Sequence, residues 1–97
     1  MAAYKYPFAD ADNDLKSQVW WKGAEIPGFS NKEWMHDKCG FVMRWADHGD
    51  RNSEHGWEID HIKPLAKQGS NDISNLQPLN WKNNAAKGDT YPWNCGR

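Results

Sequence analysis

Residues 56–64 read Gly-Trp-Glu-Ile-Asp-His-Ile-Lys-Pro, and this stretch decides the fold. Its β-branched and aromatic residues predict a strand over residues 57–62, which Pro64 ends. Side chains alternate along an ideal strand, so its two faces carry different residues: Trp57, Ile59 and His61 on one, and Glu58, Asp60 and Ile62 on the other. A carboxylate and an imidazole, Asp60 and His61, are therefore adjacent on this predicted strand.

The sequence after this strand predicts a second strand and a helix. A polar loop at residues 67–72 precedes a short apolar segment at 73–79, which Pro78 restricts to an edge strand. Asn80 can cap a final helix, which Gly88 would end. The predicted order is therefore strand, strand, helix.

The first half of the chain predicts shorter elements. Three aromatic residues around Pro7 indicate that residues 1–11 form an ordered arm rather than a helix or strand. The remaining expectations are a helix over 14–23 capped by Asp12 or Asn13, a helical turn over 33–35 capped by Ser30 or Asn31, a strand over 40–45 and a loop over 47–56.

Length and composition favour one domain. The 97 residues are near the lower end for a fold held by an ordinary hydrophobic core, so we expect one domain over residues 1–97. The mean hydropathy is low, at −1.01, but seven tryptophans supply buriable area. The net charge of −1 argues against a broadly basic surface. Several cations nevertheless lie in the second half: Lys63, Lys67, Lys82, Lys87 and Arg97.

The two cysteines and the apolar segments bear on the environment of the protein. Cys39 and Cys95 form no CxxC pair, and we expect two free, buried thiols, with a bridge between them as the less favoured alternative. No apolar stretch is long enough to span a membrane, and the first residues lack the pattern of a secretory signal. We therefore expect a cytoplasmic protein with no membrane partner, and the sequence identifies no protein partner.

Asp60 and His61 suit the hydrolysis of a phosphodiester. An attacking water must lose a proton near neutral pH, and a histidine with an unperturbed pKa of about 6.5 can accept it. The charge that develops on the phosphate can be offset by a divalent cation on oxygen ligands. Asp60 offers one such oxygen, and the predicted helix offers another from Asn84, with Asn83 as the alternative. Water and the phosphate would complete the coordination, so the cation would bind weakly without substrate.

These residues stand in motifs that resemble the HNH endonuclease family. The matching segments are residues 56–64, 69–72, 74–79, 83–84 and 87–89. They follow the family's order and lie near its usual spacing, which a bare Asp-His pair would not indicate. The resemblance implies a small α+β domain built on a ββα-metal finger at about residues 57–89. The arm and helix of residues 1–35, other short helical segments and an extra strand would precede the finger.

The resemblance also implies roles for individual residues. His61 would be the general base, while Asp60 and Asn84 would bind one divalent cation, Mg²⁺ first, with Mn²⁺, Zn²⁺ or Ni²⁺ as alternatives. Asn75 would support catalysis by bonding the loop backbone, which holds the histidine strand in register. Lys87 would contact the phosphate, unless it is a solvated last-turn cation. The implied substrate is DNA, with RNA also open, and the implied products carry a 3′-hydroxyl and a 5′-phosphate.

Other positions carry further implications. Lys63, Lys82 and Arg51 are candidates for nucleic-acid contact, although each residue type is more often solvated. Many relatives bind a structural zinc through paired CxxC motifs, but the later pair falls here on Asn80 and Asn83. We therefore expect no structural zinc. Aromatic packing would replace it, from Trp45, Trp57 and Trp81.

Two other functions stay open at this point. The same finger could bind nucleic acid without cutting it, which the near-neutral net charge allows. It could also be a structural or protein-interaction domain whose motif residues serve packing. Metal-dependent cleavage would distinguish a nuclease from both.

Overall fold

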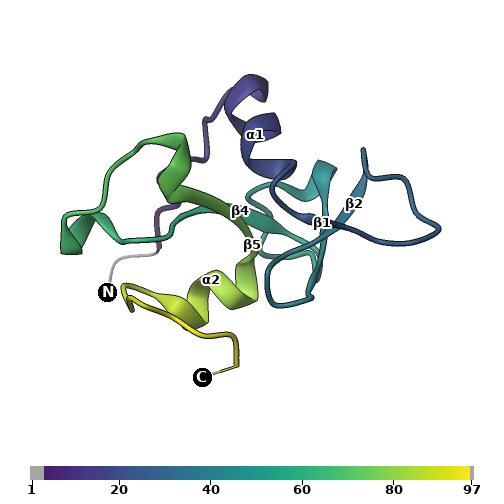
Figure 1. The fold of residues 1–97 in the computed structure, drawn as a ribbon. Helices are drawn as coiled ribbons and strands as arrows, with labels where there is room; N and C mark the ends of the chain where they lie inside the picture. The colour runs from purple at the N-terminus through teal and green to yellow at the C-terminus, as the bar shows by residue number, and fades with distance from the viewer. Residues whose placement is uncertain (1–3, 97) are drawn as a thin grey trace.

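Two antiparallel strands and the helix that follows them carry the predicted site (Figure 1). The structure is a computed structural model, and it describes residues 4–96. Strand β4 (Trp57–His61) pairs with β5 (Leu76–Asn80). Helix α2 (Trp81–Lys87) begins directly after β5, with the side chain of Asn80 as its N-cap. The predicted order of strand, strand and helix is confirmed.

Pro78 lies inside β5 at a position where its missing N–H costs nothing. It is paired in register with Ile59 of β4. The N–H of Ile59 donates to the hydroxyl of Tyr6 at 2.6 Å, on the side of β4 away from β5. This pair of residues therefore has no ladder hydrogen bonds, and a proline is tolerated there. Tyr6 at the same time covers the outer edge of β4.

A three-stranded sheet and a second helix pack against the β4–β5 hairpin. The sheet has the antiparallel order β1 (Ala24–Glu25), β2 (Trp34–His36) and β3 (Val42–Arg44). Helix α1 (Asn13–Trp20) follows the N-cap Asp12 and lies on the opposite side of the hairpin from α2 (Figure 1). The core between these elements consists of Val19, Trp20, Met35, Met43, Trp57, Ile59 and Leu76.

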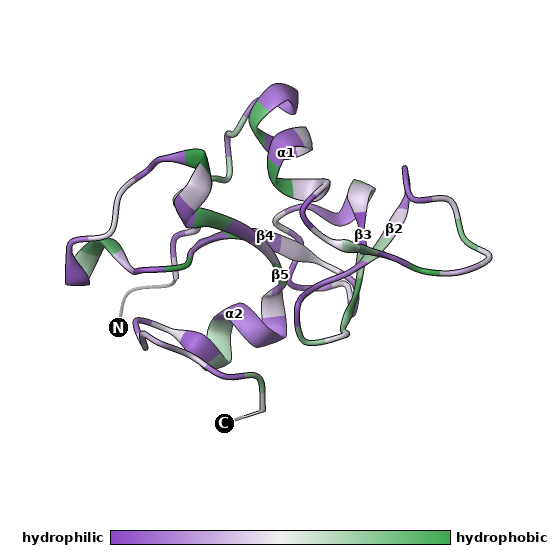
Figure 2. Ribbon diagram, viewed as in Figure 1, coloured by the Kyte–Doolittle hydropathy of each residue, from purple (hydrophilic) through white to green (hydrophobic). Residues whose placement is uncertain are grey.

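Aromatic rings supply much of this core. Figure 2 shows that hydrophilic residues make up most of the ribbon, with hydrophobic residues in short stretches. The ring centroids of Trp20 and Trp57 lie 5.1 Å apart, and those of Trp45 and Trp57 lie 5.7 Å apart. The low mean hydropathy is therefore compatible with a packed interior. Within residues 4–96, no helix has the length and apolar character needed to cross a membrane.

The first half of the chain differs from its prediction in several elements. Residues Trp34–His36 form β2, so the predicted helical turn over 33–35 is wrong. Met35 is buried there between two half-buried neighbours, which is the alternation of a strand. Three residues are too few for this alternation to be recognised in the sequence. The predicted first helix ends earlier, at Trp20, and β1 has no counterpart in the prediction. Within residues 4–96, three short 3₁₀ helices complete the structure: Trp45–Asp47, Leu65–Lys67 and Ile73–Asn75.

The two cysteines form a disulfide between Cys39, in the turn after β2, and Cys95, in the C-terminal tail. The expectation of free thiols is therefore wrong, and the alternative of a bridge is correct. Their separation of 56 residues hides the pairing from the sequence, because only the fold brings the two Cα atoms to 5.4 Å. The bridge ties the tail after α2 to the three-stranded sheet and removes Cys39 from any zinc site.

Asp37, beside the bridge, is a buried link between the three-stranded sheet and α2. Its Oδ1 accepts hydrogen bonds from the N–H groups of Cys39 and Phe41, both at 2.9 Å. Its Oδ2 accepts from the N–H of Asn80 and from Nδ2 of Asn83, also at 2.9 Å. These asparagines stand where the resemblance puts zinc-binding cysteines in relatives. Hydrogen bonds and a disulfide therefore connect these elements in addition to the expected aromatic packing.

The N-terminal arm is ordered against β4 from residue 4 onward, and residues 1–3 of the predicted arm lie outside the described residues. The hydroxyl of Tyr6 lies 2.9 Å from Nε2 of His48. Burial, with a smaller contribution from Lys16, lowers the pKa of His48 to about 4. The ring is therefore neutral at pH 7, and it shares a hydrogen bond with the hydroxyl of Tyr6.

Replacing Asp37 should destabilise the fold. Asp37→Asn keeps one oxygen acceptor but turns an N–H₂ group toward two of the four donors. We expect the free energy of unfolding to fall by about 3 kcal/mol, because hydrogen bonds to a buried charge are lost. Urea denaturation measures this change, and Asp10→Asn, at an exposed position, should change it by less than about 0.5 kcal/mol. Equal stability of the two variants would show that the Asp37 network contributes little.

His48 should make stability depend on pH. Between pH 6.5 and about 4 the unfolded chain binds a proton on this imidazole that the folded chain does not, so the free energy of unfolding falls as the pH falls. His48→Gln removes the titration but keeps an acceptor for Tyr6. Denaturation from pH 7 to pH 4 should therefore show a shallower fall in this variant than in the wild type.

The control for the loss of one imidazole is His36→Gln, because His36 lies in β2, away from the Tyr6 contact. It should keep the wild-type pH dependence. The same slope in His48→Gln and in the wild type would contradict a neutral His48 beneath the arm.

Candidate active site

A cleft of about 430 Å³ opens between β4, α2 and the N-terminal arm. Five predicted site residues line it together: Arg51, Asp60, His61, Asn84 and Lys87. The rest of its wall combines aromatic, aliphatic and a few polar residues: Tyr4, Pro7, Phe8, Ile59, Pro64, Leu65, Ala66, Ala85, Gly88 and Asp89. The fold therefore brings the strand residues and the helix residues of the prediction into one cavity.

Asp60 is held at this cleft by partners from β5 and α2. Its side chain is buried, and its Oδ2 accepts a hydrogen bond from Nε2 of Gln77 at 2.9 Å. Both carboxylate oxygens lie 3.3 Å from Nζ of Lys87. Burial raises the pKa of this carboxyl, while the bond from Gln77 and the charge of Lys87 oppose the rise. A carboxylate in such a position can ligate a hard cation.

Lys87 is a buried residue of the site. Its exposed fraction is 3%, and its Nζ donates to the backbone carbonyl of His61 at 2.9 Å in addition to its contact with Asp60. The alternative interpretation as a solvated last-turn cation is therefore wrong. Contact with a phosphate stays a prediction for this ammonium.

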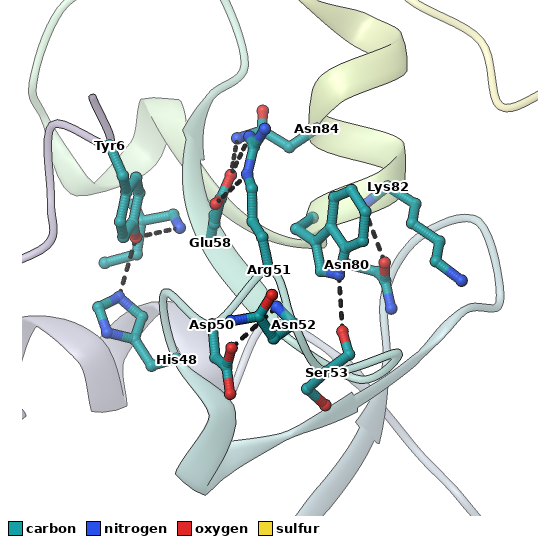
Figure 3. Close-up of polar contacts among 12 residues, drawn as sticks. Tyr6, His48, Asp50, Arg51, Asn52, Ser53, Glu58, Asn80, Lys82 and Asn84 are labelled. Atoms are coloured by element: carbon teal, nitrogen blue, oxygen red, sulfur yellow. Dashed lines mark hydrogen bonds and ion pairs between the residues drawn. The ribbon is translucent and has the colours of Figure 1, made fainter. Parts of the chain in front are cut away.

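Glu58 is a site residue to which the sequence prediction assigned no role. It is 1% exposed and lies on the same face of β4 as Asp60, as the predicted alternation requires. Its carboxylate accepts from Nε and Nη2 of Arg51, each at 2.9 Å, and from Nδ2 of Asn84 at 2.7 Å (Figure 3). Asn84 is thus the helix asparagine that faces the cleft, because Asn83 is bonded to Asp37.

The guanidinium of Arg51 is ordered by rings as well as by Glu58. It lies 4.0 Å from the ring centroid of Tyr4 and 5.6 Å from that of Trp81. The hydrogen bond that Arg51 donates to Glu58 raises the pKa of Arg51, and burial raises the pKa of Tyr4. This arginine pairs with a carboxylate of the chain itself, and its predicted contact with nucleic acid is untested.

His61 presents one free ring nitrogen to its surroundings. Its Nε2 lies 2.7 Å from Oδ1 of Asn71, and its ring packs 5.1 Å from the ring of Phe8. Because an amide oxygen only accepts, Nε2 carries the hydrogen and Nδ1 of the neutral ring is left to accept a proton. Asn71 belongs to the loop motif in the sequence, but nothing in its spacing showed that it touches His61.

Asn75 makes the loop contacts that the resemblance implies. Its Nδ2 donates to the carbonyls of Lys63 at 3.0 Å and Ser70 at 2.7 Å, and its Oδ1 accepts from the N–H of Lys63 at 2.9 Å. Its backbone carbonyl accepts from the N–H of Ile62. The amide therefore joins both ends of the loop that follows His61.

The other predicted cations lie outside the cleft wall. Lys63 and Lys82 are both exposed. Lys63 extends over the ring of Tyr91 and Lys82 over that of Trp81, with Nζ about 6 Å from each ring centroid. Both remain predictions as nucleic-acid contacts.

The ligands available for a cation are few. Among residues 4–96, no group of three or more His, Cys, Asp or Glu side chains is arranged to hold a metal ion. The protein ligands that the resemblance implies at the cleft are the carboxylate of Asp60 and the amide oxygen of Asn84. These oxygens are of the kind that Mg²⁺ accepts, with water and substrate in its remaining positions.

Comparison with known proteins identifies one family. The profile described as HNH endonuclease matches residues 38–90, which is more than half of the chain. The matched range contains β4, β5, α2 and every predicted site residue. No curated protein and no solved structure matches the chain.

Proposed function

Because the chain belongs to the HNH endonuclease family, we propose that it hydrolyses phosphodiester bonds of DNA in the cleft between β4 and α2. The observation that carries this proposal is the convergence of Asp60, His61 and Asn84 on one cleft. Family membership supports nuclease activity on a nucleic acid. The choice of DNA over RNA as the substrate rests on the resemblance alone.

Asp60 and Asn84 would hold one divalent cation. A carboxylate and an amide are oxygen donors, which favours Mg²⁺ or Mn²⁺ over Zn²⁺ or Ni²⁺. When bound, the cation supplies Lewis-acid stabilisation of charge on the phosphate and the leaving oxygen. Two protein ligands leave several positions to water and substrate, so its affinity should be low in the free protein.

His61 would activate the attacking water. Nδ1 accepts the proton as the water oxygen bonds to phosphorus and the bond from phosphorus to O3′ breaks. A proton from solvent water then converts O3′ to a 3′-hydroxyl, the other fragment keeps a 5′-phosphate, and Nδ1 returns its proton to solvent. Asn71 orients the ring through Nε2, and Asn75 keeps the following loop in place.

Lys87 would connect substrate binding to Asp60. Its ammonium balances the buried carboxylate in the free protein, and a phosphate that enters the cleft would meet the same ammonium. A shared cationic group of this kind offsets charge both before and after substrate binds.

The location of the protein bears on where this activity would act. The cytoplasmic location expected from the sequence remains a prediction. The Cys39–Cys95 bridge is the observation that argues against it, because disulfides persist mainly in oxidising environments.

His61→Ala should remove cleavage but leave cation binding intact. Conversion of supercoiled plasmid to nicked and linear forms, with Mg²⁺ or Mn²⁺, measures the first property. We expect a loss of at least about 100-fold, because general-base catalysis contributes that much or more. Electron paramagnetic resonance of free Mn²⁺ measures the second, which should equal the wild-type value. His55→Ala is the matched control, because the ring of His55 packs edge-on against Trp34 outside the cleft wall.

The outcomes distinguish the other functions. If His61→Ala cleaves plasmid as fast as the wild type, His61 is not the general base. Binding of DNA with no metal-dependent cleavage would favour a non-cleaving nucleic-acid module. Neither binding nor cleavage, in a folded protein, would favour a structural or protein-interaction domain.

A further inference from the structure

Glu58 has no part in the proposed reaction, yet its carboxylate is buried beneath the cleft. It is the second carboxylate on this face of β4, and three hydrogen bonds converge on it (Figure 3). Two come from Arg51 and neutralise its charge. The third comes from Asn84, the proposed helix ligand, and is the shortest of the three at 2.7 Å.

The bond between Asn84 and Glu58 can form in only one way. An ionised carboxylate accepts hydrogen bonds but cannot donate them, so the N–H₂ end of the Asn84 amide must face Glu58. The amide oxygen must then face the opposite direction, and Figure 3 shows it pointing away from Glu58. Asn84 also lines the cleft.

The direction of this amide decides what Asn84 can bind. The terminal torsion of asparagine is roughly two-fold, so an amide without a partner can place either its oxygen or its nitrogen at a given point. Only the oxygen can ligate a cation such as Mg²⁺. On the basis of the proposed function, we propose that Glu58 is a positioning residue that keeps the oxygen of Asn84 available to the cation.

Arg51 makes this arrangement stable. A buried carboxylate with only one amide partner would be poorly satisfied, and the two bonds from Arg51 complete it. The arginine is in turn stacked on Tyr4 of the arm and lies near Trp81 at the start of α2. The arm, the loop before β4 and α2 therefore meet at the carboxylate that orients Asn84.

Replacing Glu58 in two backgrounds tests the proposal. Glu58→Gln places here a side-chain amide that can donate as well as accept a hydrogen bond, so it no longer selects one orientation of the Asn84 amide. The dissociation constant for Mn²⁺, from electron paramagnetic resonance of the free ion, should rise about 10-fold, the low end for partners of metal ligands. In an Asn84→Asp background a carboxylate presents oxygen in both orientations. Glu58→Gln should therefore not weaken Mn²⁺ binding there.

Three controls make the outcome clear. Glu33→Gln is the matched replacement, because Glu33 pairs with Arg44 through the same kind of contact at an exposed position. It should not change Mn²⁺ binding. Asn84→Ala should weaken binding, and thermal denaturation should confirm that every variant is folded.

Each result has one meaning. If Glu58→Gln weakens Mn²⁺ binding equally in both backgrounds, its effect is general and the positioning role is wrong. If it has no effect in either while Asn84→Ala does weaken binding, the positioning role is wrong but the proposed metal site stands. If Asn84→Ala binds Mn²⁺ as tightly as the wild type, the proposed metal site is wrong, and the positioning role is wrong with it.

Discussion

The burial of two carboxylates on one face of β4 is the constraint on which the rest of the cleft depends. Glu58 and Asp60 are 1% and 7% exposed, and buried charges are stable only when partners neutralise and hydrogen-bond them. Those partners come from three other segments: Arg51 before β4, Gln77 in β5, and Asn84 and Lys87 in α2. Because all of them must reach the same face, polar contacts as well as packing set the position of α2 over β4.

Another buried carboxylate, away from the cleft, supports the position of α2. Asp37 joins the turn after β2 to the start of α2, and the Cys39–Cys95 bridge adds a covalent tie to the tail. The site and its support are therefore chemically separate. Asp60 and Asn84 face the cleft, while the hydrogen bonds of Asp37 hold the start of α2 and the disulfide holds the tail after α2. A chain of 97 residues with a polar composition gains rigidity from such links where a large hydrophobic core is not available.

Local signals around the site could be read from the sequence, whereas contacts between distant residues could not. The alternation after Gly56 correctly put Glu58 and Asp60 on one face, and Asn80 correctly marked the start of α2. Met35 was wrongly assigned to a helical turn, because β2 has only three residues and is too short to show the alternation of a strand. The bond from Asn83 to Asp37 spans 46 residues, and the disulfide spans 56. Such pairings, like the burial of Lys87, depend on how elements pack, which no local pattern encodes.

A crystal structure of the wild-type protein with Mn²⁺, located by its anomalous signal, tests most directly whether this cleft is a metal-dependent active site. The ion should lie in the cleft, with an oxygen of Asp60 and the oxygen of Asn84 as its protein ligands and His61 facing the water or phosphate beside it. An ion bound elsewhere, or an Asn84 whose nitrogen faces the ion site, would contradict that arrangement. A crystal saturated with Mn²⁺ in which Asp60 still contacts only Lys87 and Gln77 would also contradict it.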